Sequence, residues 1–298
     1  MKKIGYGPSN LVKAIYLTPG ILIYTLAVFV PVAGAIYYSF FNWTGGPKKV
    51  FSGLANYQEM LTDKLFWSSF RNNLVLTLVC IIGQIGLAFL FSSILQSRLT
   101  KLKSIHRAFA YFPVTISAVV VGFVWSMIYD YNYGMLNTFL KIAGLGQFAK
   151  PWLSQSDFIM LKVSIPIIWQ YIGLYLVIIL AAYSSINKEV FEMAELDGAN
   201  GLKQALYITI PLIRNSLIVC LMLCISGNMK AFDHIFVMTN GGPGTSSTVM
   251  AMYAYQTAFL KYRMGYGTTL SIGILILSLA LVLFSRLILQ RLSSKEVE

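Results

Sequence analysis

The sequence predicts an all-α integral membrane protein with about six transmembrane helices. Hydrophobic residues make up 57% of the 298 residues and charged residues only 11%, whereas soluble domains contain about 25% charged residues. The mean hydropathy is +0.68. Long runs without a charged side chain recur along the chain and are separated by short polar segments. No segment has the composition of a separate soluble domain.

The transmembrane helices are predicted from these runs, because a helix that crosses about 30 Å of hydrocarbon needs about 20 apolar residues. Five runs are long enough. A sixth, from Asn215 to Met229, is shorter and is followed by Lys230, Asp233 and His234 before apolar residues resume. We count it, because five spans would place the two chain ends on opposite sides of the membrane. The expected spans cover residues 15–40, 72–97, 107–129, 163–186, 212–236 and 265–287 of a single domain, 1–298.

Basic side chains predict the orientation, since short cytoplasmic loops are enriched in Lys and Arg. The segment 187–211 and both termini are therefore expected in the cytoplasm, and the loops 42–71, 130–162 and 239–263 outside. The bias is modest, because the outer loops also contain basic residues. The residues that indicate the cytoplasmic side are Lys2, Lys3, Lys13, Arg98, Lys101, Lys103, Arg107, Arg286, Arg291 and Lys295.

The first span has an alternative interpretation as a cleavable signal peptide. Lys2 and Lys3, an apolar core and Ala33-Gly34-Ala35 are typical of one. Its apolar run is long enough to anchor the chain, which favours a retained helix.

Missing motifs exclude several classes of function. No G-x-x-x-x-G-K-[ST] loop occurs, so the chain is not expected to hydrolyse nucleotides. Cys220-x-x-x-Cys224 lacks the two-residue gap of zinc and redox motifs. The net charge of +12 does not indicate nucleic acid, because the basic residues flank apolar spans. We therefore expect no catalytic residue, no metal and no nucleic-acid partner.

The segment 187–211 is an acidic, amphipathic interruption between two apolar spans. Asn187 can cap a helix, because its side chain accepts from backbone N–H groups. Gly198 tolerates the positive φ that ends a helix, and Asn200 can cap a second one. The pattern predicts a helix over about 188–197, a glycine bend and a second helix that leads into the next span.

The first helix of this segment is predicted to dock onto another protein. Apolar residues cover more of its surface than one narrow stripe requires, and Ala194 would let a partner backbone approach. The alternative is a helix on lipid headgroups, which its carboxylates disfavour at an anionic leaflet. The apolar residues are Val190, Phe191, Met193, Ala194 and Leu196, and the carboxylates are Glu189, Glu192, Glu195 and Asp197.

Two motifs resemble those of a known family. Glu192-Met193-Ala194, Asp197-Gly198-Ala199 and Ile208-Thr209-Ile210-Pro211 are similar to the EAA signature in membrane subunits of binding-protein-dependent ABC importers. The stretch 232–244 resembles the carbohydrate-uptake branch, which includes the maltose and glycerol-phosphate transporters. Met193 stands for the usual Ala and Ile210 for the usual Leu, and both are apolar exchanges.

The resemblance implies half of the pore of a type I importer in the bacterial plasma, or inner, membrane. Its partners would be a homologous second permease, two ATPase subunits and an extracytoplasmic solute-binding protein that delivers a sugar or oligosaccharide. ATP and Mg²⁺ would bind to the ATPase subunits, so this chain would bind no cofactor and would not be an enzyme. By the same likeness, the residues that contact the ATPase would be Glu192, Ala194, Asp197 and Gly198.

The outer loop Thr239-Asn240-Gly241-Gly242-Pro243 has two interpretations. Successive glycines with a proline form a tight turn that exposes backbone groups. The loop could contact the delivering protein or gate the outer end of the pore. Alternatively, it only connects two helices.

Polar residues within the spans are candidates for the substrate path, because each is costly in lipid and tends to face a cavity. These residues are Asn228, Lys230, Asp233, His234 and Gln170. On a continuous fifth helix, Lys230 would lie one turn from Asp233 and His234, so a local ion pair is an equally good interpretation. If only the second permease contacts the sugar, none of them would line the path.

A secondary, ion-coupled solute transporter is the alternative function. Such transporters need charged residues near mid-membrane for ion coupling and usually have about ten or more helices. The central parts of five spans are uncharged here. The ABC importer is therefore favoured.

Overall fold

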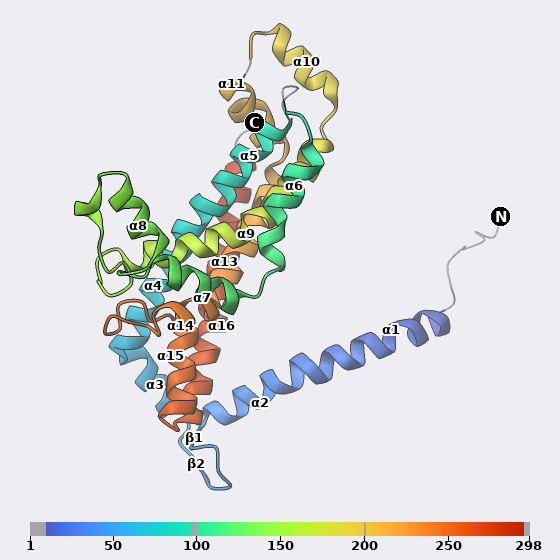
Figure 1. Cartoon of the computed structure of the whole chain (residues 1–298). Helices are drawn as coiled ribbons and strands as arrows, with labels where there is room; N and C mark the ends of the chain where they lie inside the picture. Colours follow the sequence, from blue (N-terminus) through green and yellow to red (C-terminus); the bar gives the residue numbers. More distant parts are fainter. Residues whose placement is uncertain (1–9, 97–99, 200, 295–298) are drawn as a thin grey trace, which may run out of the picture. The chain divides into compact units, whose positions relative to one another are not determined.

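The computed structural model describes residues 10–96, 100–199 and 201–294, and these are mostly helical (Figure 1). The sequence predicts one domain over 1–298. In the structure, the contacts group into two compact units. The first comprises Met1–Asp63 and Ala254–Gly273, and the second comprises Lys64–Tyr253 and Ile274–Glu298.

The first unit begins with a long apolar helix that leads into a short hairpin. α1 (Asn10–Tyr24), a π-helical segment (Thr25–Phe29) and α2 (Val30–Ser39) are continuous, and Leu11–Ser39 is long and apolar enough to cross a membrane. β1 (Phe41–Trp43) and β2 (Lys49–Phe51) pair antiparallel, with Phe41 opposite Phe51. The unit also contains α3 (Ala55–Thr62), a π-helical segment (Gln256–Leu260) and the first part of α16 (Met264–Ser294).

Two polar contacts hold the hairpin end of this unit. Asn56 is buried, and its Nδ2 donates to Ser39 O at 2.8 Å and to Phe41 O at 3.0 Å. Arg263 donates to both carboxylate oxygens of Glu59, at 2.8 and 2.6 Å. That ion pair is exposed, so solvent screens it and its contribution is small. The buried amide is the stronger constraint, because it satisfies two carbonyls where α2 ends and β1 begins.

The second unit contains most of the other helices (Figure 1). α4 (Lys64–Cys80), a π-helical segment (Ile81–Gly86) and α5 (Leu87–Gln96) form one long apolar helix, and α9 (Ile159–Ser184) forms another. The shorter helices are α6 (Lys103–Tyr111), α7 (Ala118–Ile128), α8 (Met135–Ile142), α10 (Lys188–Leu196), α11 (Leu202–Gln204), α12 (Ile210–Leu212), α13 (Arg214–Met229), α14 (Asp233–Met238) and α15 (Met250–Tyr255). Three short segments, Phe112–Thr115, Gly146–Phe148 and Ala205–Thr209, are 3₁₀-helical or π-helical.

Two of the expected spans are bent. Lys103–Thr115 and Ala118–Ile128 meet at 97°, and Leu202–Leu212 and Arg214–Met229 meet at 79°. The described residues therefore contain four continuous helices that could span a membrane, or six if each bent pair is one span. The all-α membrane fold is confirmed. The third and fifth spans are interrupted, although the sequence predicts each as one helix, over 107–129 and 212–236.

The bend in the third span occurs at Ile116 and Ser117. Pro113 lies in a 3₁₀ turn, after which Ile116 is extended, with φ −82° and ψ 141°. An extended residue loses its place in the helical hydrogen-bond ladder, and hydrocarbon contains no water to replace the missing bond. Gln170, buried in α9, supplies the donor, since its Nε2 lies 2.7 Å from Ile116 O.

The fifth span ends at Met229 rather than near residue 236, and a buried side chain caps it there. Asn73 of α4 is fully buried, and its Nδ2 donates to Asn228 O at 2.9 Å and to Met229 O at 3.3 Å. The last carbonyls of a helix have no hydrogen-bond donor within the helix. The Asn73 amide supplies the donor that a further turn of α13 would have supplied. Its Oδ1 also accepts from Met250 N–H at 2.8 Å. One side chain therefore joins both ends of the segment 230–249.

A third gap, in the backbone hydrogen bonding rather than in the helix itself, lies within α9. Pro166 has no N–H, so the carbonyl of Lys162, four residues earlier, loses its helical donor. The hydroxyl of Tyr129 donates to this carbonyl at 3.1 Å. Each of these three gaps is therefore matched by a buried donor from another element.

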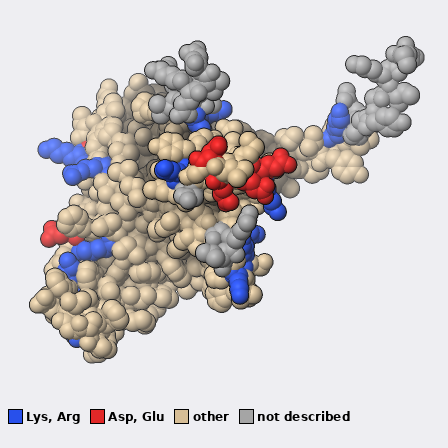
Figure 2. Space-filling view, turned by 90° about the horizontal axis from the view of Figure 1, so that it is seen from above, with Lys and Arg blue, Asp and Glu red and all other residues tan. Residues whose placement is uncertain are grey.

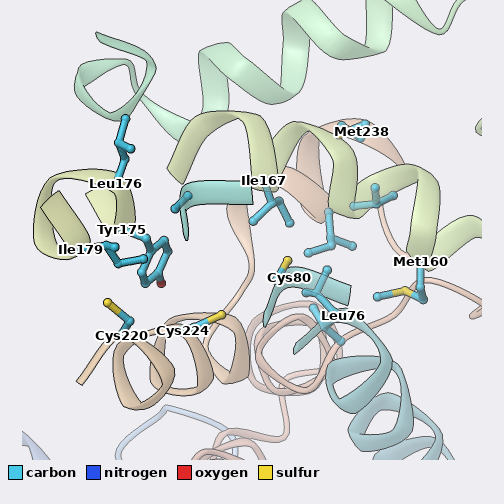
Figure 3. Close-up of a cluster of buried hydrophobic side chains, with 14 of the residues drawn as sticks. Leu76, Cys80, Met160, Ile167, Tyr175, Leu176, Ile179, Cys220, Cys224 and Met238 are labelled. Carbon is cyan, nitrogen blue, oxygen red and sulfur yellow. The ribbon is translucent and has the colours of Figure 1, made fainter. Parts of the chain in front are cut away.

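Apolar packing between α4, α9 and α13 forms the core of the second unit (Figure 3). Tyr175 reaches from α9 toward the face of α13 that carries Cys220 and Cys224 (Figure 3). Gln84 crosses this core and joins two helices, since it accepts from Cys224 Sγ at 3.3 Å and donates to Ile167 O at 3.2 Å. The cysteines are free and buried, and they pack as small apolar residues.

We expect Asn73→Ala to lower the free energy of unfolding by about 2 kcal/mol, because buried backbone groups lose their partners. Denaturant titration of the purified protein in detergent measures this change. Asn132→Ala removes the same amide from an exposed position and is the control. Equal unfolding midpoints for the two variants would contradict the capping role of Asn73.

Candidate functional site

α10 corresponds to the helix that the acidic segment predicts. Asn187 caps its first turn, because its Oδ1 accepts from Glu189 N–H at 3.3 Å. Gly198 follows the helix with a φ of +76°, and Ala199 N–H donates to Ala194 O at 2.8 Å. The predicted cap, helix and glycine bend are confirmed, because each depends on residues that are close in sequence.

The second helix of the segment begins after another glycine. Asn200, which the sequence suggests as its cap, lies outside the described residues. Gly201 precedes α11 with a φ of +52°, a conformation that favours glycine. α11, the π-helical segment Ala205–Thr209 and α12 then lead to α13.

The two sides of α10 differ in exposure. Met193 is 65% exposed, whereas Ala194 is only 6% exposed. Glu192, Asp197 and Gly198 are also exposed. Acidic side chains gather in one patch on the face of the molecule seen in Figure 2. Three of the four residues expected to contact an ATPase are therefore accessible, while the small side chain of Ala194 lets α10 pack closely on its own chain.

Stacked aromatic rings attach α10 to the rest of the second unit. Phe191 of α10 stacks on Tyr183 of α9, with ring centroids 6.5 Å apart and an interplanar angle of 16°. Tyr183 stacks in turn on Phe89 of α5 at 6.2 Å, and its hydroxyl lies 2.8 Å from Ser93 Oγ. Sequence reasoning missed this connection. Tyr183 lies near the end of a predicted span, and Phe191 is one of several apolar residues predicted on the surface of the first helix. Neither position by itself indicates that the two rings stack.

Two of the five candidates for the substrate path lie together. His234 Nε2 is 2.6 Å from Gln170 Oε1, and both side chains are buried. Because Gln170 also donates to Ile116 O, this pair joins α9 and α14 to the bend of the third span. Asn228 is buried elsewhere and donates to Cys224 O at 2.8 Å. The polar groups of these three residues are engaged within the chain, and their role in a path stays a prediction.

Lys230 and Asp233 are exposed and do not share a helix. The sequence predicts both on one continuous helix, but α13 ends at Met229 and α14 begins at Asp233. Within the described residues, no ion pair joins the two side chains. The cap from Asn73 explains the difference, because it ends α13 before Lys230.

The loop 239–243 is an internally hydrogen-bonded turn after α14. Asn240 and Gly241 have φ values of 47° and 84°, and Asn and Gly are the residues that best tolerate this conformation. Ser247 Oγ donates to Gly242 O at 2.6 Å. The side chain of Asn240 is exposed. Contact with the delivering protein, gating of the outer end of the pore and a simple connection all stay predictions for this loop.

The candidate site combines exposed carboxylates with buried hydrogen-bonding groups. Among the described residues, no group of three or more His, Cys, Asp or Glu side chains could hold a metal ion. The carboxylates of α10 are exposed, whereas the buried polar groups are amides and an imidazole on separate elements. The buried groups hold helices together, and docking of the exposed helix α10 onto a protein stays a prediction.

Known proteins share the sequence and the fold of this chain. Residues 84–295 match the model of a family described as binding-protein-dependent transport system inner membrane component. The probable ABC transporter permease protein YurN of Bacillus subtilis is 30% identical over 277 residues, which cover 92% of this chain and 94% of that protein. The sulfoquinovosyl glycerol transport system permease protein SmoG of Agrobacterium fabrum is 30% identical over 280 residues, or 91% and 87% of the two chains. In fold, the chain is similar to one in the crystal structure of a bacterial ABC transporter involved in the import of the acidic polysaccharide alginate. That match has a TM-score of 0.80 and 22% identity, and it covers 94% of this chain and 95% of that chain.

We expect Asn187→Ala to destabilise α10 by about 1 kcal/mol, because the first turn loses its capping acceptor. The amide hydrogens of the first turns should then exchange about five times faster. Hydrogen exchange followed by mass spectrometry of the detergent-solubilised protein measures this rate. Asn187→Ser keeps an acceptor and should retain the original rate, whereas slow exchange in Asn187→Ala would show that the cap is unimportant.

Proposed function

The chain belongs to the family of binding-protein-dependent transport system inner membrane components, and on this premise we propose that it forms half of the pore of an ATP-driven sugar importer. Proteins of this family are permease subunits of the inner membrane rather than enzymes. Family membership therefore favours the importer over ion-coupled secondary transport. By the distribution of basic residues, both termini are proposed to lie in the cytoplasm.

α10 is proposed to dock into a cleft of an ATPase subunit. The observation that carries this proposal is that the chain leaves a large apolar surface of α10 uncovered beside its carboxylates. Leu196 is 88% exposed and Met193 is 65% exposed, and burying such a side chain is worth about 1.5–3 kcal/mol. Glu192 and Asp197 lie next to them, so the partner is expected to surround an apolar cleft with Lys or Arg. Gly198 would set the angle at which α10 leaves the cleft.

The aromatic stack is proposed to carry the movement of α10 into the pore. ATP and Mg²⁺ would bind to the two ATPase subunits, and closure of these subunits would displace α10. Because Phe191 packs on Tyr183, displacement of α10 would shift α9 as well. The populations of the inward-facing and outward-facing states change only if the ATPase contacts differ between them. Two orientations of α10 in the cleft would provide that difference.

A sugar or oligosaccharide is the proposed substrate. The relative SmoG is named for the transport of sulfoquinovosyl glycerol, and the stretch 232–244 resembles the carbohydrate-uptake branch. Gln170, His234 and Asn228 are proposed to lie near the path, with Lys230 and Asp233 at its outer end. The loop 239–243 is proposed to face the extracytoplasmic binding protein. A homologous second permease would supply the other half of the pore.

The test of this function is purification of the assembled complex from native membranes through a tag on this chain. An ATPase subunit, a second permease and a binding protein should purify with it. ATP hydrolysis in proteoliposomes should rise when the binding protein and its sugar are added. Copurification without stimulation by any saccharide would point to another class of substrate, and absence of an ATPase subunit would overturn the proposal.

We expect Gly198→Asp to lower transport about tenfold or more, because it places a branched side chain at the positive φ of the bend after α10, where backbone strain costs about 1–3 kcal/mol. Membrane insertion should be unchanged, since an added Cβ at Gly198 meets no atom within 4 Å. Uptake of labelled sugar and the amount of inserted protein are the two measurements.

Gly144→Asp is the matched control for this variant. Gly144 has a φ of +74°, close to the +76° of Gly198, and an added Cβ also meets no atom within 4 Å. Both variants place an Asp at nearly the same positive φ and add the same charge, but Gly144 lies in a loop predicted to be outside the cell. Equal transport in the two variants would show that the bend after α10 has no specific role in transport.

A further inference from the structure

One face of the β1–β2 hairpin is aromatic. Side chains alternate between the two faces of a strand, and residues opposite each other in paired strands share a face. Phe41 pairs with Phe51 and Trp43 pairs with Lys49, so these four side chains lie on one face. The rings of Phe41 and Phe51 meet edge to face, with centroids 5.4 Å apart. We call this surface the aromatic face.

The aromatic face packs back onto the last turn of α2. The ring of Trp43 stacks on Tyr38, with centroids 4.2 Å apart, and the ring of Phe41 lies 4.8 Å from that of Tyr37. Lys49 Nζ lies 4.6 Å from the centroid of the Tyr37 ring and donates to its hydroxyl at 3.1 Å. Because α2 directly precedes the hairpin (Figure 1), the aromatic face is turned toward this helix and not away from it.

Two helices that are long and apolar enough to cross a membrane meet at the hairpin. Leu11–Ser39 ends just before β1, and Met264–Leu289 begins beside it. An added Cβ at Gly265 would collide with Phe41 O, so the first turn of α16 contacts the strand. Each spanning helix passes from hydrocarbon into the headgroup layer near its end. The hairpin therefore lies at the membrane–water interface, and its aromatic face is directed toward the membrane side.

The ammonium of Lys49 is accessible at this interface. Its side chain is exposed, and no carboxylate of the described residues pairs with it. The carboxylates outside the described residues belong to Glu296 and Glu298. These follow the last residue of α16, a helix of 31 residues that is about 45 Å long, whereas the hairpin contacts its first turn. The length of a membrane span therefore separates them from Lys49.

We propose that the aromatic face binds a phospholipid. Lys49 contacts the phosphate of the headgroup, and Phe51 and Tyr37 contact the glycerol and the upper part of the acyl chains. Aromatic rings are favoured at this depth, and a lysine there keeps its stem on apolar surface and its ammonium in the polar layer. Because both kinds of contact lie on one face, a single lipid reaches both. This inference depends on the chain crossing a membrane and not on the transported substrate.

The extracytoplasmic binding protein is the alternative partner of this face. A soluble protein approaches the hairpin from the aqueous side, whereas the aromatic face is turned toward the last turn of a membrane helix. The lipid is therefore favoured, and the experiments below separate the two partners.

The first experiment places a probe on each face of the hairpin. Val50 pairs with Asn42 on the face opposite Phe51, and the two positions are matched in exposure, at 68% and 69%. Val50→Cys and Phe51→Cys are each labelled with an environment-sensitive fluorophore in the assembled complex, in nanodiscs of phosphatidylcholine. The unsubstituted complex gives the background. We expect nitroxide-labelled lipid to quench the probe at position 51 severalfold more than the probe at position 50, and aqueous iodide to show the reverse order.

Two results of this experiment would overturn the proposal. Equal quenching by the lipid at the two positions would show that the faces do not differ in their contact with the membrane. Quenching by iodide at position 51 that disappears when the binding protein is added would show that the aromatic face binds protein instead.

The second experiment keeps every ring and changes one charge. Lys49→Gln is compared with Lys48→Gln, which removes the same charge from the adjacent exposed position. Phosphatidylglycerol with a photoreactive group near the headgroup is cross-linked to each complex below saturation, and peptide mass spectrometry measures the yield at the hairpin. A lysine near an anionic surface contributes about fivefold in affinity, so the yield should fall about fivefold in Lys49→Gln and much less in Lys48→Gln. Equal yields in the two variants would contradict a contact between Lys49 and the phosphate.

Discussion

The fold depends on one constraint, which is that a carbonyl within hydrocarbon needs a donor from the protein itself. In the second unit, backbone hydrogen bonds of the helices are missing at Ile116, Met229 and Pro166, although α9 continues through Pro166, and each gap would leave a carbonyl unsatisfied. A buried side chain from another element supplies the missing donor each time, from Gln170, Asn73 and Tyr129 respectively. The gaps are therefore also the points at which α4, α7, α9, α13 and α14 are tied together. Each missing helical hydrogen bond is replaced here by a tertiary one.

This arrangement attaches a short surface helix firmly to the membrane helices. α10 is only nine residues long, which is too short to be stable alone. Its inner side packs through Ala194 and Phe191, and Phe191 stacks on a tyrosine of α9. α9 in turn carries Gln170, which binds the bend of the third span and reaches His234 in α14. A displacement of α10 would therefore act on helices that are hydrogen-bonded to one another rather than on independent helices.

Features that depend on local sequence could be predicted, and those that depend on remote partners could not. Charge-free runs located the helices, and Asn187 and Gly198 marked the limits of α10, because caps and positive φ values act over a few residues. The breaks at Ile116 and Met229 were not predictable in this way. Their donors lie 54 and 156 residues away in the chain, and Pro113 alone does not show where the helix ends. One signal was available, since Asn73 is a polar residue within a predicted apolar span, and such residues are costly unless they are bonded.

The central claim is that α10 presents its exposed side to an ATPase while its inner side holds it to the pore. Adjacent residues on the two sides allow the most direct measurement. Met193→Cys and Ala194→Cys would each be introduced into the assembled complex and treated with a thiol-to-amine cross-linker. The native cysteines of this chain are buried, and the unsubstituted complex gives the background from the other subunits. Because Met193 is 65% exposed and Ala194 only 6%, we expect Met193→Cys to cross-link to the ATPase subunit and Ala194→Cys not to. Equal yields from the two positions, or no cross-link from Met193→Cys, would contradict the account.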